Sequence, residues 1–93
     1  MIVRVIIPAL NEEGAIGNVI SEIPKEFVEE IIVVDNNSKD ATAENAKKAG
    51  VTVLHQSLSG YGNACLKGLE YVFEKKTDLV IFMDADHADD PKQ

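Results

Sequence analysis

The last apolar run of this chain ends abruptly in acidic side chains. Residues 79–83 are apolar, Asp84 and Asp86 follow with one alanine between them, and two more aspartates occupy positions 89 and 90. A carboxylate at the end of a buried strand is costly unless it has a partner, because burial removes its water. Carboxylate oxygens are the ligands that Mg²⁺ and Mn²⁺ prefer. The pattern therefore favours a divalent-cation site over a solvated acidic tail.

Other segments that could contact a ligand also follow apolar runs. Glu12 comes after the first apolar run of the chain, Asp35 ends the second, and a loop with Gly60 and Gly62 follows the third. In a parallel α/β sheet, ligands bind beyond the carboxyl ends of the strands, at the point where the strand order reverses. We therefore expect these segments and Asp84 to form one site, which binds a nucleoside diphosphate through a metal ion.

Four strands and three helices are expected to position this site. Continuous apolar and β-branched runs predict strands at residues 2–7, 31–35, 51–54 and 79–83. Helically spaced apolar residues predict helices that end near residues 23, 49 and 74. Pro8 is expected to end the first strand, and Asn11 to cap the first helix. The order βαβαβαβ predicts a three-layer α/β fold, a mostly parallel sheet with right-handed crossovers and helices on both faces.

Composition narrows the class of protein. The 93 residues are enough for one domain with a modest core. A net charge of −7 without clustered Lys or Arg argues against nucleic-acid binding. No apolar run approaches the roughly 20 residues of a membrane span, and the N-terminus lacks the features of a signal peptide. One cysteine is consistent with a reducing compartment, so we expect a cytoplasmic protein, located at the membrane surface if a longer form is anchored there.

Three common nucleotide- or phosphate-binding folds do not fit this order of motifs. The sequence has no Gly-x-x-x-x-Gly-Lys-Ser/Thr segment of a Walker loop. Its first turn between strand and helix lacks the glycine fingerprint of a dinucleotide-binding fold, because Gly60 and Gly62 occur only after the third strand. A phospho-accepting receiver domain would have its acidic pair after the first strand, whereas Asp84 and Asp86 follow the fourth.

Four segments together resemble the family 2 glycosyltransferases. They follow the family's order, each at a predicted strand end: PALNEE at residues 8–13, VVDNNSKD at 33–40, GYGNA at 60–64 and DAD at 84–86. The glycine segment and the closing DDP at 89–91 are most similar to the branch that transfers sugars to dolichyl or polyprenyl phosphates. The resemblance implies the A-type nucleotide-sugar fold, with residues 1–93 as its Rossmann-like, donor-binding part.

The resemblance also implies roles for individual residues. The nucleotide of a UDP- or GDP-sugar donor would be bound by Pro8, Ala9, Glu12, Asp35, Gly60, Gly62 and Asp84. Asp86 would ligate a Mg²⁺ or Mn²⁺ ion that bridges the diphosphate. The two glycines would allow close approach of the backbone, since they lack a Cβ atom. The acceptor implied by the branch is a polyprenyl phosphate, and no residue of this chain is assigned as the general base.

The family's domain continues beyond the segment at 84–86, so the resemblance implies that this chain is a truncated form of it. We expect the chain alone to bind donor weakly or not at all and to transfer no sugar. Its fourth strand would be a sheet edge that can pair with another copy to form a homo-oligomer. The alternative function is therefore a non-catalytic nucleotide-binding or oligomerising module.

Overall fold

The computed structural model describes residues 1–85. Its strands are β1 (Val3–Ala9), β2 (Glu30–Asp35), β3 (Thr52–His55) and β4 (Leu79–Phe82). Its helices are α1 (Ile16–Ser21), α2 (Thr42–Lys48) and α3 (Tyr61–Phe73), with a short 3₁₀ turn, η1 (Lys25–Phe27). This order confirms the alternation of strands and helices that the sequence predicts. The expected metal ligand Asp86 and the DDP segment lie outside the described residues.

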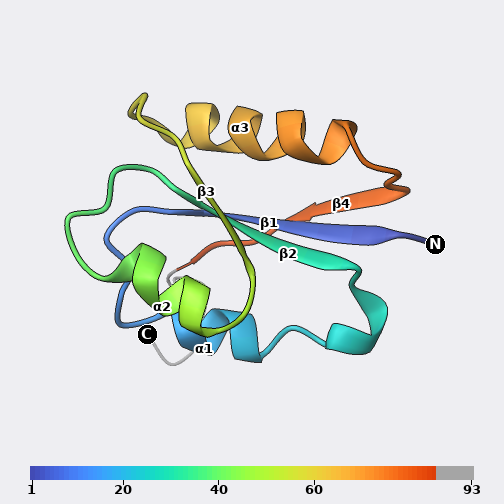
Figure 1. Cartoon of the computed structure of the whole chain (residues 1–93), viewed down its shortest axis with the longest axis horizontal. Coiled ribbons are helices and arrows are strands. Elements are labelled where there is room, and N and C mark those ends of the chain that lie inside the picture. Colours follow the sequence, from blue (N-terminus) through green and yellow to red (C-terminus); the bar gives the residue numbers. More distant parts are fainter. Residues whose placement is uncertain (86–93) are drawn as a thin grey trace.

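The four strands are parallel and lie in the order β3-β2-β1-β4. The chain moves outward from β1 through β2 to β3, and α3 then brings it back to β4 on the other side of β1 (Figure 1). The strand order therefore reverses between β1 and β4. In open parallel sheets, the crevice at such a reversal is where ligands bind. The topology therefore predicts a ligand site at the carboxyl ends of these two strands.

Helices cover both faces of the sheet, as the sequence predicts. α1 and α2 lie on one face and α3 on the other (Figure 1). Successive residues of the central strands β1 and β2 point to opposite faces, and both sets are buried because both faces are covered. The core under α1 and α2 includes Val5, Ile7, Ile16, Val19, Ile20, Ile31, Val33 and Ala46. The core under α3 consists of Ile6, Ile32, Val34, Ala64 and Val72.

α3 approaches β1 very closely at one glycine. A Cβ atom at Gly68 would lie 2.6 Å from Cγ2 and 3.0 Å from Cδ1 of Ile6. Carbon atoms in favourable contact stay about 3.5–4.0 Å apart, so glycine is the residue that lets the helix lie at this height. Glycine weakens a helix interior, and close packing against the sheet offsets that cost here.

Pro8 lies within β1, whereas the sequence pattern predicts that it ends the strand. β1 continues because Ala9 still pairs with Asp35 of β2. Alternate residues of a parallel strand direct their backbone groups to opposite neighbours, and Pro8 faces the side of β4. On that side the last paired residues are Ile6 of β1 and Phe82 of β4. Pro8 lies beyond this pair, so the N–H group that proline lacks would have no strand partner. Proline is tolerated at such a position.

Asn11 does not cap α1, contrary to the prediction. The helix begins at Ile16, and the preceding residue, Ala15, makes no side-chain cap. Asn11 has a φ of 54°, a left-handed conformation that asparagine tolerates better than most residues. Its N–H donates to Oγ of Ser38 at 2.9 Å, and its Oδ1 accepts the N–H of Lys39 at 2.8 Å. The side chain therefore joins two loops instead of starting a helix.

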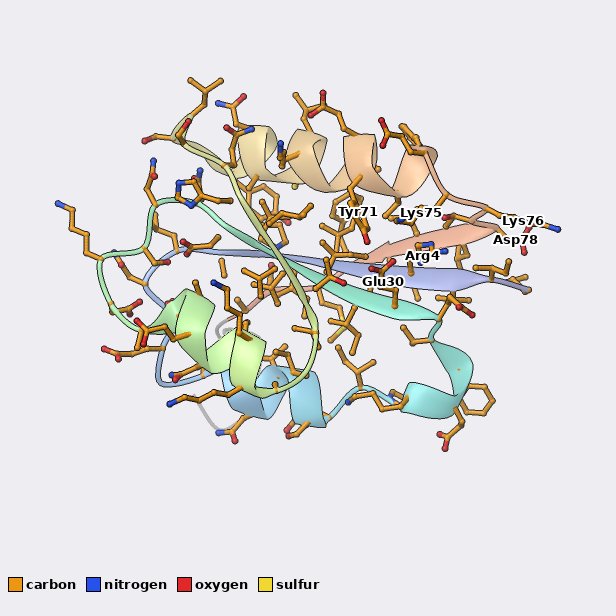
Figure 2. All side chains as sticks on the ribbon, in the orientation of Figure 1. Arg4, Glu30, Tyr71, Lys75, Lys76 and Asp78 are labelled. Carbon is orange, nitrogen blue, oxygen red and sulfur yellow. The ribbon has the colours of Figure 1, made fainter. Side chains whose placement is uncertain are left out.

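A polar network ties the amino ends of three strands to α3 (Figure 2). Glu30 of β2 accepts hydrogen bonds from Oγ1 of Thr52 at 2.7 Å and from the hydroxyl of Tyr71 at 2.5 Å. It also forms an ion pair with Arg4, whose Nε donates to Oγ1 of Thr77 at 3.0 Å. Burial alone would raise the pKa of Glu30. The hydrogen bonds from Thr52 and Tyr71 and the charge of Arg4 outweigh it, so this pKa lies below its ordinary value.

β4 is an edge of the sheet in the part of the chain that the structure describes, as predicted. Its strand partner there is β1 alone, and Leu79, Ile81 and Phe82 are 44%, 40% and 41% exposed. An exposed apolar edge with unpaired backbone groups is a surface to which another strand can pair.

Within residues 1–85, no helix has the length and apolar character needed to cross a membrane.

Candidate functional site

Two pockets adjoin at the carboxyl end of β1. The first, of about 220 Å³, is lined by Pro8, Ala9, Leu10, Asn36, Gly60, Tyr61 and Ala64. The second, of about 190 Å³, is lined by Pro8, Leu10, Glu12, Tyr61, Asp84 and Ala85. Pro8, Leu10 and Tyr61 belong to both pockets. The two cavities therefore share a wall at the point where the strand order reverses, which is where a parallel sheet binds its ligands.

Most of the predicted nucleotide-binding residues lie in these two pockets. They are Pro8, Ala9, Glu12, Gly60 and Asp84. Neither Asp35 nor Gly62 lines either pocket. Gly62 lies in the first turn of α3, and a Cβ atom there would meet nothing within 4 Å. The packing of the described residues therefore does not require glycine at this position.

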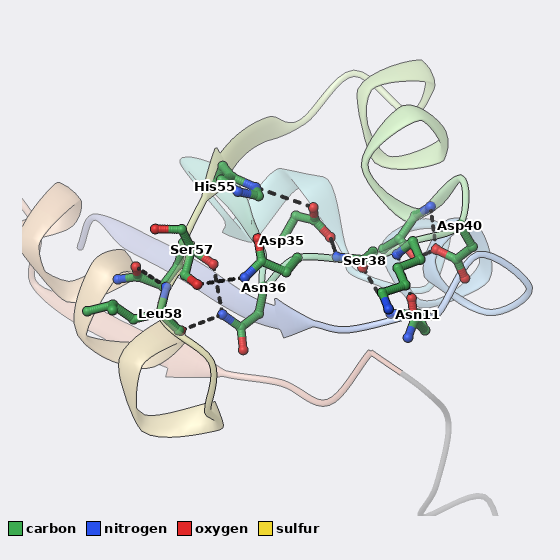
Figure 3. A network of polar contacts seen from close by, with 12 residues as sticks. Asn11, Asp35, Asn36, Ser38, Asp40, His55, Ser57 and Leu58 are labelled. Carbon is green, nitrogen blue, oxygen red and sulfur yellow. Dashed lines mark hydrogen bonds and ion pairs between the residues drawn. The ribbon is translucent and has the colours of Figure 1, made fainter.

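Asp35 is buried at the end of β2 and makes local contacts (Figure 3). It is 6% exposed, and its Oδ1 accepts the N–H of Ser38 at 3.3 Å. Its Oδ2 lies 3.6 Å from Nδ1 of His55, an exposed residue at the end of β3. The carboxylate thus supports the turn after β2 and faces the imidazole, and the next residue, Asn36, lines the first pocket in its place.

Asn36 holds the loop between β3 and α3 against the end of β2 (Figure 3). Its Nδ2 donates to the carbonyl oxygens of Gln56 and Leu58, both at 2.8 Å, and its Oδ1 accepts the N–H of Gly60 at 3.0 Å. The residue is only 6% exposed, so these contacts satisfy both amide hydrogens and the amide oxygen inside the protein. Asn36 therefore fixes the position of the glycine loop at the pocket.

Gly60 begins α3 at the edge of the first pocket. Its φ of 122° and ψ of 142° belong to a backbone conformation that favours glycine. Its carbonyl oxygen accepts the N–H of Ala64 at 3.2 Å, which closes the first turn of the helix. The amino end of a helix carries a partial positive charge and favours anions. This end of α3, at Gly60 and Tyr61, therefore gives the pocket wall a suitable polarity for phosphate groups.

Tyr61 stands between the two pockets. The residue is 60% exposed and lines both of them. The pKa of its hydroxyl is raised above the ordinary value, first by loss of water around it and then by Cys65 and the charge of Asp84. Tyrosine combines a flat apolar ring with a polar end. Such a residue can contact the ring of a ligand while its hydroxyl stays protonated.

Two acidic residues, Glu12 and Asp84, line the second pocket. These hard oxygen donors suit Mg²⁺ or Mn²⁺, and Mg²⁺ is typically held by one or two carboxylates together with substrate phosphates. Among residues 1–85, no cluster of three or more His, Cys, Asp or Glu side chains forms a metal-binding group. The donor set in the described residues therefore fits an ion shared with a phosphorylated ligand, and the predicted ligand Asp86 lies outside these residues.

Sequence reasoning missed several residues that line the pockets, namely Leu10, Asn36, Tyr61, Ala64 and Ala85. All of them lie inside the four segments that carry the family motifs, so adjacency to a motif residue was the available signal. The motifs do not show which neighbour faces the pocket. Asn36 does so rather than Asp35, and Tyr61 rather than Gly62.

Comparisons with known proteins agree on one family. The model of "Glycosyl transferase family 2" matches residues 4–93. An uncharacterized protein of Methanocaldococcus jannaschii is 40% identical over 89 residues, which are 95% of this chain and 37% of that protein. A UDP-N-acetylglucosamine–dolichyl-phosphate N-acetylglucosaminyltransferase of Methanococcus voltae is 30% identical over 109 residues, covering 96% of this chain and 43% of that enzyme. The chain therefore spans less than half the length of these relatives.

A solved enzyme structure shares the fold. The crystal structure of glucosyl-3-phosphoglycerate synthase from Mycobacterium tuberculosis contains Mn²⁺, UDP and glucosyl-3-phosphoglycerate. It matches this chain with a TM-score of 0.79 and 33% sequence identity, covering 90% of this chain and 33% of that one. The match confirms the predicted A-type glycosyltransferase fold. The family model, the relatives and this structure together show that the chain belongs to glycosyl transferase family 2.

Proposed function

We propose that this chain is the donor-binding part of a glycosyltransferase that uses a divalent metal ion to transfer a sugar from a UDP- or GDP-sugar to an acceptor. One observation carries the proposal. The four motif segments, which are far apart in the sequence, all contribute residues to the same pair of pockets. The pockets lie at the reversal of strand order, the usual ligand position in such a sheet.

The first pocket suits the nucleoside of the donor. Pro8, Ala9 and Leu10 supply apolar surface, and Asn36 also lines the pocket. Gly60 allows the ligand to approach the backbone, and the amino end of α3 favours the diphosphate. UDP is the first nucleotide to test, because UDP or a UDP-sugar is named for the enzymes from M. tuberculosis and M. voltae.

Asp35 and Gly62, which line neither pocket, are also proposed to contact the nucleotide. Asp35 would accept a hydrogen bond from the base, which requires the base to extend to the end of β2, where Ser38 and His55 lie beside the carboxylate. Gly62 would contribute only through the backbone of the first turn of α3. Neither role follows from the pocket lining, and each rests on the family motif.

The second pocket suits the metal and the ribose. Asp84 would lie toward the ribose, Glu12 would form part of the same wall, and Asp86 would ligate Mg²⁺ or Mn²⁺. Mn²⁺ is present with UDP in the glucosyl-3-phosphoglycerate synthase structure. When bound, the ion supplies Lewis-acid stabilisation of the charge that grows on the departing diphosphate.

The acceptor is proposed to carry a phosphate, with a polyprenyl phosphate as the specific candidate. A dolichyl phosphate is named for the M. voltae enzyme, and glucosyl-3-phosphoglycerate is named for the mycobacterial one. General-base catalysis requires a group within hydrogen-bond reach of the acceptor, and we assign none in this chain. The 93-residue chain alone is therefore expected to transfer no sugar.

Calorimetry with UDP, UDP-sugars and GDP-sugars, with and without Mn²⁺, tests the proposal on this chain. We expect weak binding of one nucleotide series, and this binding should strengthen with Mn²⁺. The affinity should fall by about tenfold or more in Asp84→Asn and in Asp86→Asn, because each change removes a carboxylate proposed to contact the ribose or the metal. Glu26→Gln, on exposed η1, is the matched control and should bind as the unchanged chain does.

Two results would contradict the proposal. One is nucleotide binding by the unchanged chain that does not depend on Mn²⁺ and is kept at full strength in both aspartate variants. The other is loss of binding in Glu26→Gln as well, which would point to net charge as the cause and not to the pocket. Absence of binding to every nucleotide would leave the second candidate function, a module that associates through the exposed edge of β4. The exposed apolar residues of that edge are the observation that favours it.

A further inference from the structure

Two loops at the carboxyl edge of the sheet, one with Asn11 and the other with Ser38 and Asp40, are joined by hydrogen bonds (Figure 3). Oγ1 of Thr42 accepts the N–H of Glu12 at 2.8 Å, and Oδ2 of Asp40 accepts the N–H of Glu13 at 3.3 Å. Nδ2 of Asn45 donates to the carbonyl oxygen of Glu13 at 3.0 Å. We call the side chains of Asp40 and Thr42, with the Glu12 and Glu13 backbone that they bind, the brace.

The two side chains of the brace are also hydrogen-bonded to each other. Thr42 is the first residue of α2 and is fully buried. Its hydroxyl donates to Oδ1 of Asp40, and its N–H donates to the same oxygen at 3.0 Å. The hydrogen bond from the Thr42 hydroxyl is the main cause that lowers the pKa of Asp40. The carboxylate therefore remains an ionised acceptor for both loops.

The turn that the brace holds has little regular structure of its own. Asn11 has a positive φ, and α1 starts only at Ile16 without a side-chain cap. The carbonyl oxygen of Glu12 accepts the N–H groups of Ala15 and Ile16 at 3.1 and 2.9 Å. Glu12 is thus bound through its C=O to the start of α1 and through its N–H to Thr42. Removal of the Thr42 contact would free one side of this turn.

We propose that Asp40 and Thr42 are positioning residues, which fix the turn from Leu10 to Glu12 so that it forms a wall of both pockets and sets the affinity for a nucleoside diphosphate. The inference rests on the proposed function for its last step. Neither Asp40 nor Thr42 lines either pocket, so their effect on a ligand would pass through the backbone of Glu12. Residues 38–42, which overlap the end of the second motif, then position the first motif and do not contact the ligand directly.

The first test measures hydrogen exchange of backbone amides by NMR in the 93-residue chain. Thr42→Val removes the hydroxyl at similar size, and Thr42→Ser retains it. Val72→Ala, in the core under α3, is a control for general loss of stability. We expect exchange at the Glu12 amide to rise on the order of tenfold more in Thr42→Val than in Val72→Ala, since one hydrogen bond is lost there, and Thr42→Ser to restore it. Asp40→Asn should act in the same way at Glu13 and provides a second variant if Thr42→Val does not fold.

The second test measures the affinity for UDP with Mn²⁺ in the same variants. Severalfold weaker binding in Thr42→Val and Asp40→Asn, with normal binding in Thr42→Ser and Val72→Ala, supports the positioning role. Unchanged exchange at Glu12 and Glu13 overturns the brace, and faster exchange with unchanged UDP affinity overturns its effect on the site. If the unaltered chain binds neither UDP nor GDP, the proposed function fails for this chain, and the exchange data alone decide whether Asp40 and Thr42 hold the turn.

Discussion

Asn36 shows how a single side chain can organise the proposed donor site. A buried amide with two donors and an acceptor can join three backbone groups at once, which neither an aspartate nor a serine can do with the same polarity. Here those groups belong to Gln56, Leu58 and Gly60. The loop that carries Gly60 therefore depends on a residue from the end of β2, far away in the sequence.

Asn36→Ala should destabilise the protein by about 2–3 kcal/mol, because it removes three hydrogen bonds that a buried side chain makes to the backbone of the loop before α3. Chemical denaturation followed by circular dichroism measures this change in the free energy of unfolding. Asn18→Ala, on the exposed side of α1, is the matched control and should shift stability by less than about 0.5 kcal/mol. Equal effects of the two substitutions would show that the Asn36 contacts contribute little.

The close packing of helix α3 on strand β1 depends on Gly68. Gly68→Ala should destabilise by about 1–3 kcal/mol, because the added Cβ atom would lie 2.6 Å from Cγ2 of Ile6 and the helix or the isoleucine must move. Gly17→Ala, in α1, meets nothing within 4 Å and should stabilise by up to about 1 kcal/mol through helix propensity. Thermal unfolding of both variants tests the pair, and stabilisation by both would contradict the tight contact.

The network around Glu30 predicts how stability depends on pH. The pKa of this group is lowered in the folded protein from an ordinary value of 4.5. A lowered pKa means that its contribution is fully present above pH 4.5 and is lost as the pH falls through the folded-state value. Glu30→Gln should therefore be less stable than the unchanged chain at neutral pH, and the difference should shrink below pH 4.5. Urea unfolding across this range measures it, and a constant difference would exclude the charge as the cause.

In the part of the whole molecule that the structure describes, the edge of the sheet formed by β4 is exposed. The backbone groups and the apolar side chains of that edge favour pairing with a second copy. We expect concentration-dependent self-association of the chain, which Ile81→Lys should weaken, since a charge at an edge disfavours strand pairing. Phe27→Lys, on η1, replaces an even more exposed apolar residue away from that edge and should leave association unchanged. Sedimentation velocity distinguishes these cases, and a monomer at all concentrations would remove the oligomerising module as a candidate.

The order of strands and helices, the parallel sheet and the family can all be predicted from the sequence. Apolar runs and helical spacing are local patterns, and the carboxyl ends of parallel strands must share one edge. The course of β1 through Pro8 cannot be predicted in this way, because it depends on tertiary pairing: β4 stops pairing with β1 at Ile6. Two further features come from the tertiary structure as well: Asn36 rather than Asp35 lines the pocket, and Thr42 holds the backbone of Glu12. These contacts join residues that are distant along the chain, and local periodicity carries no information about which of two neighbouring side chains will face a cavity.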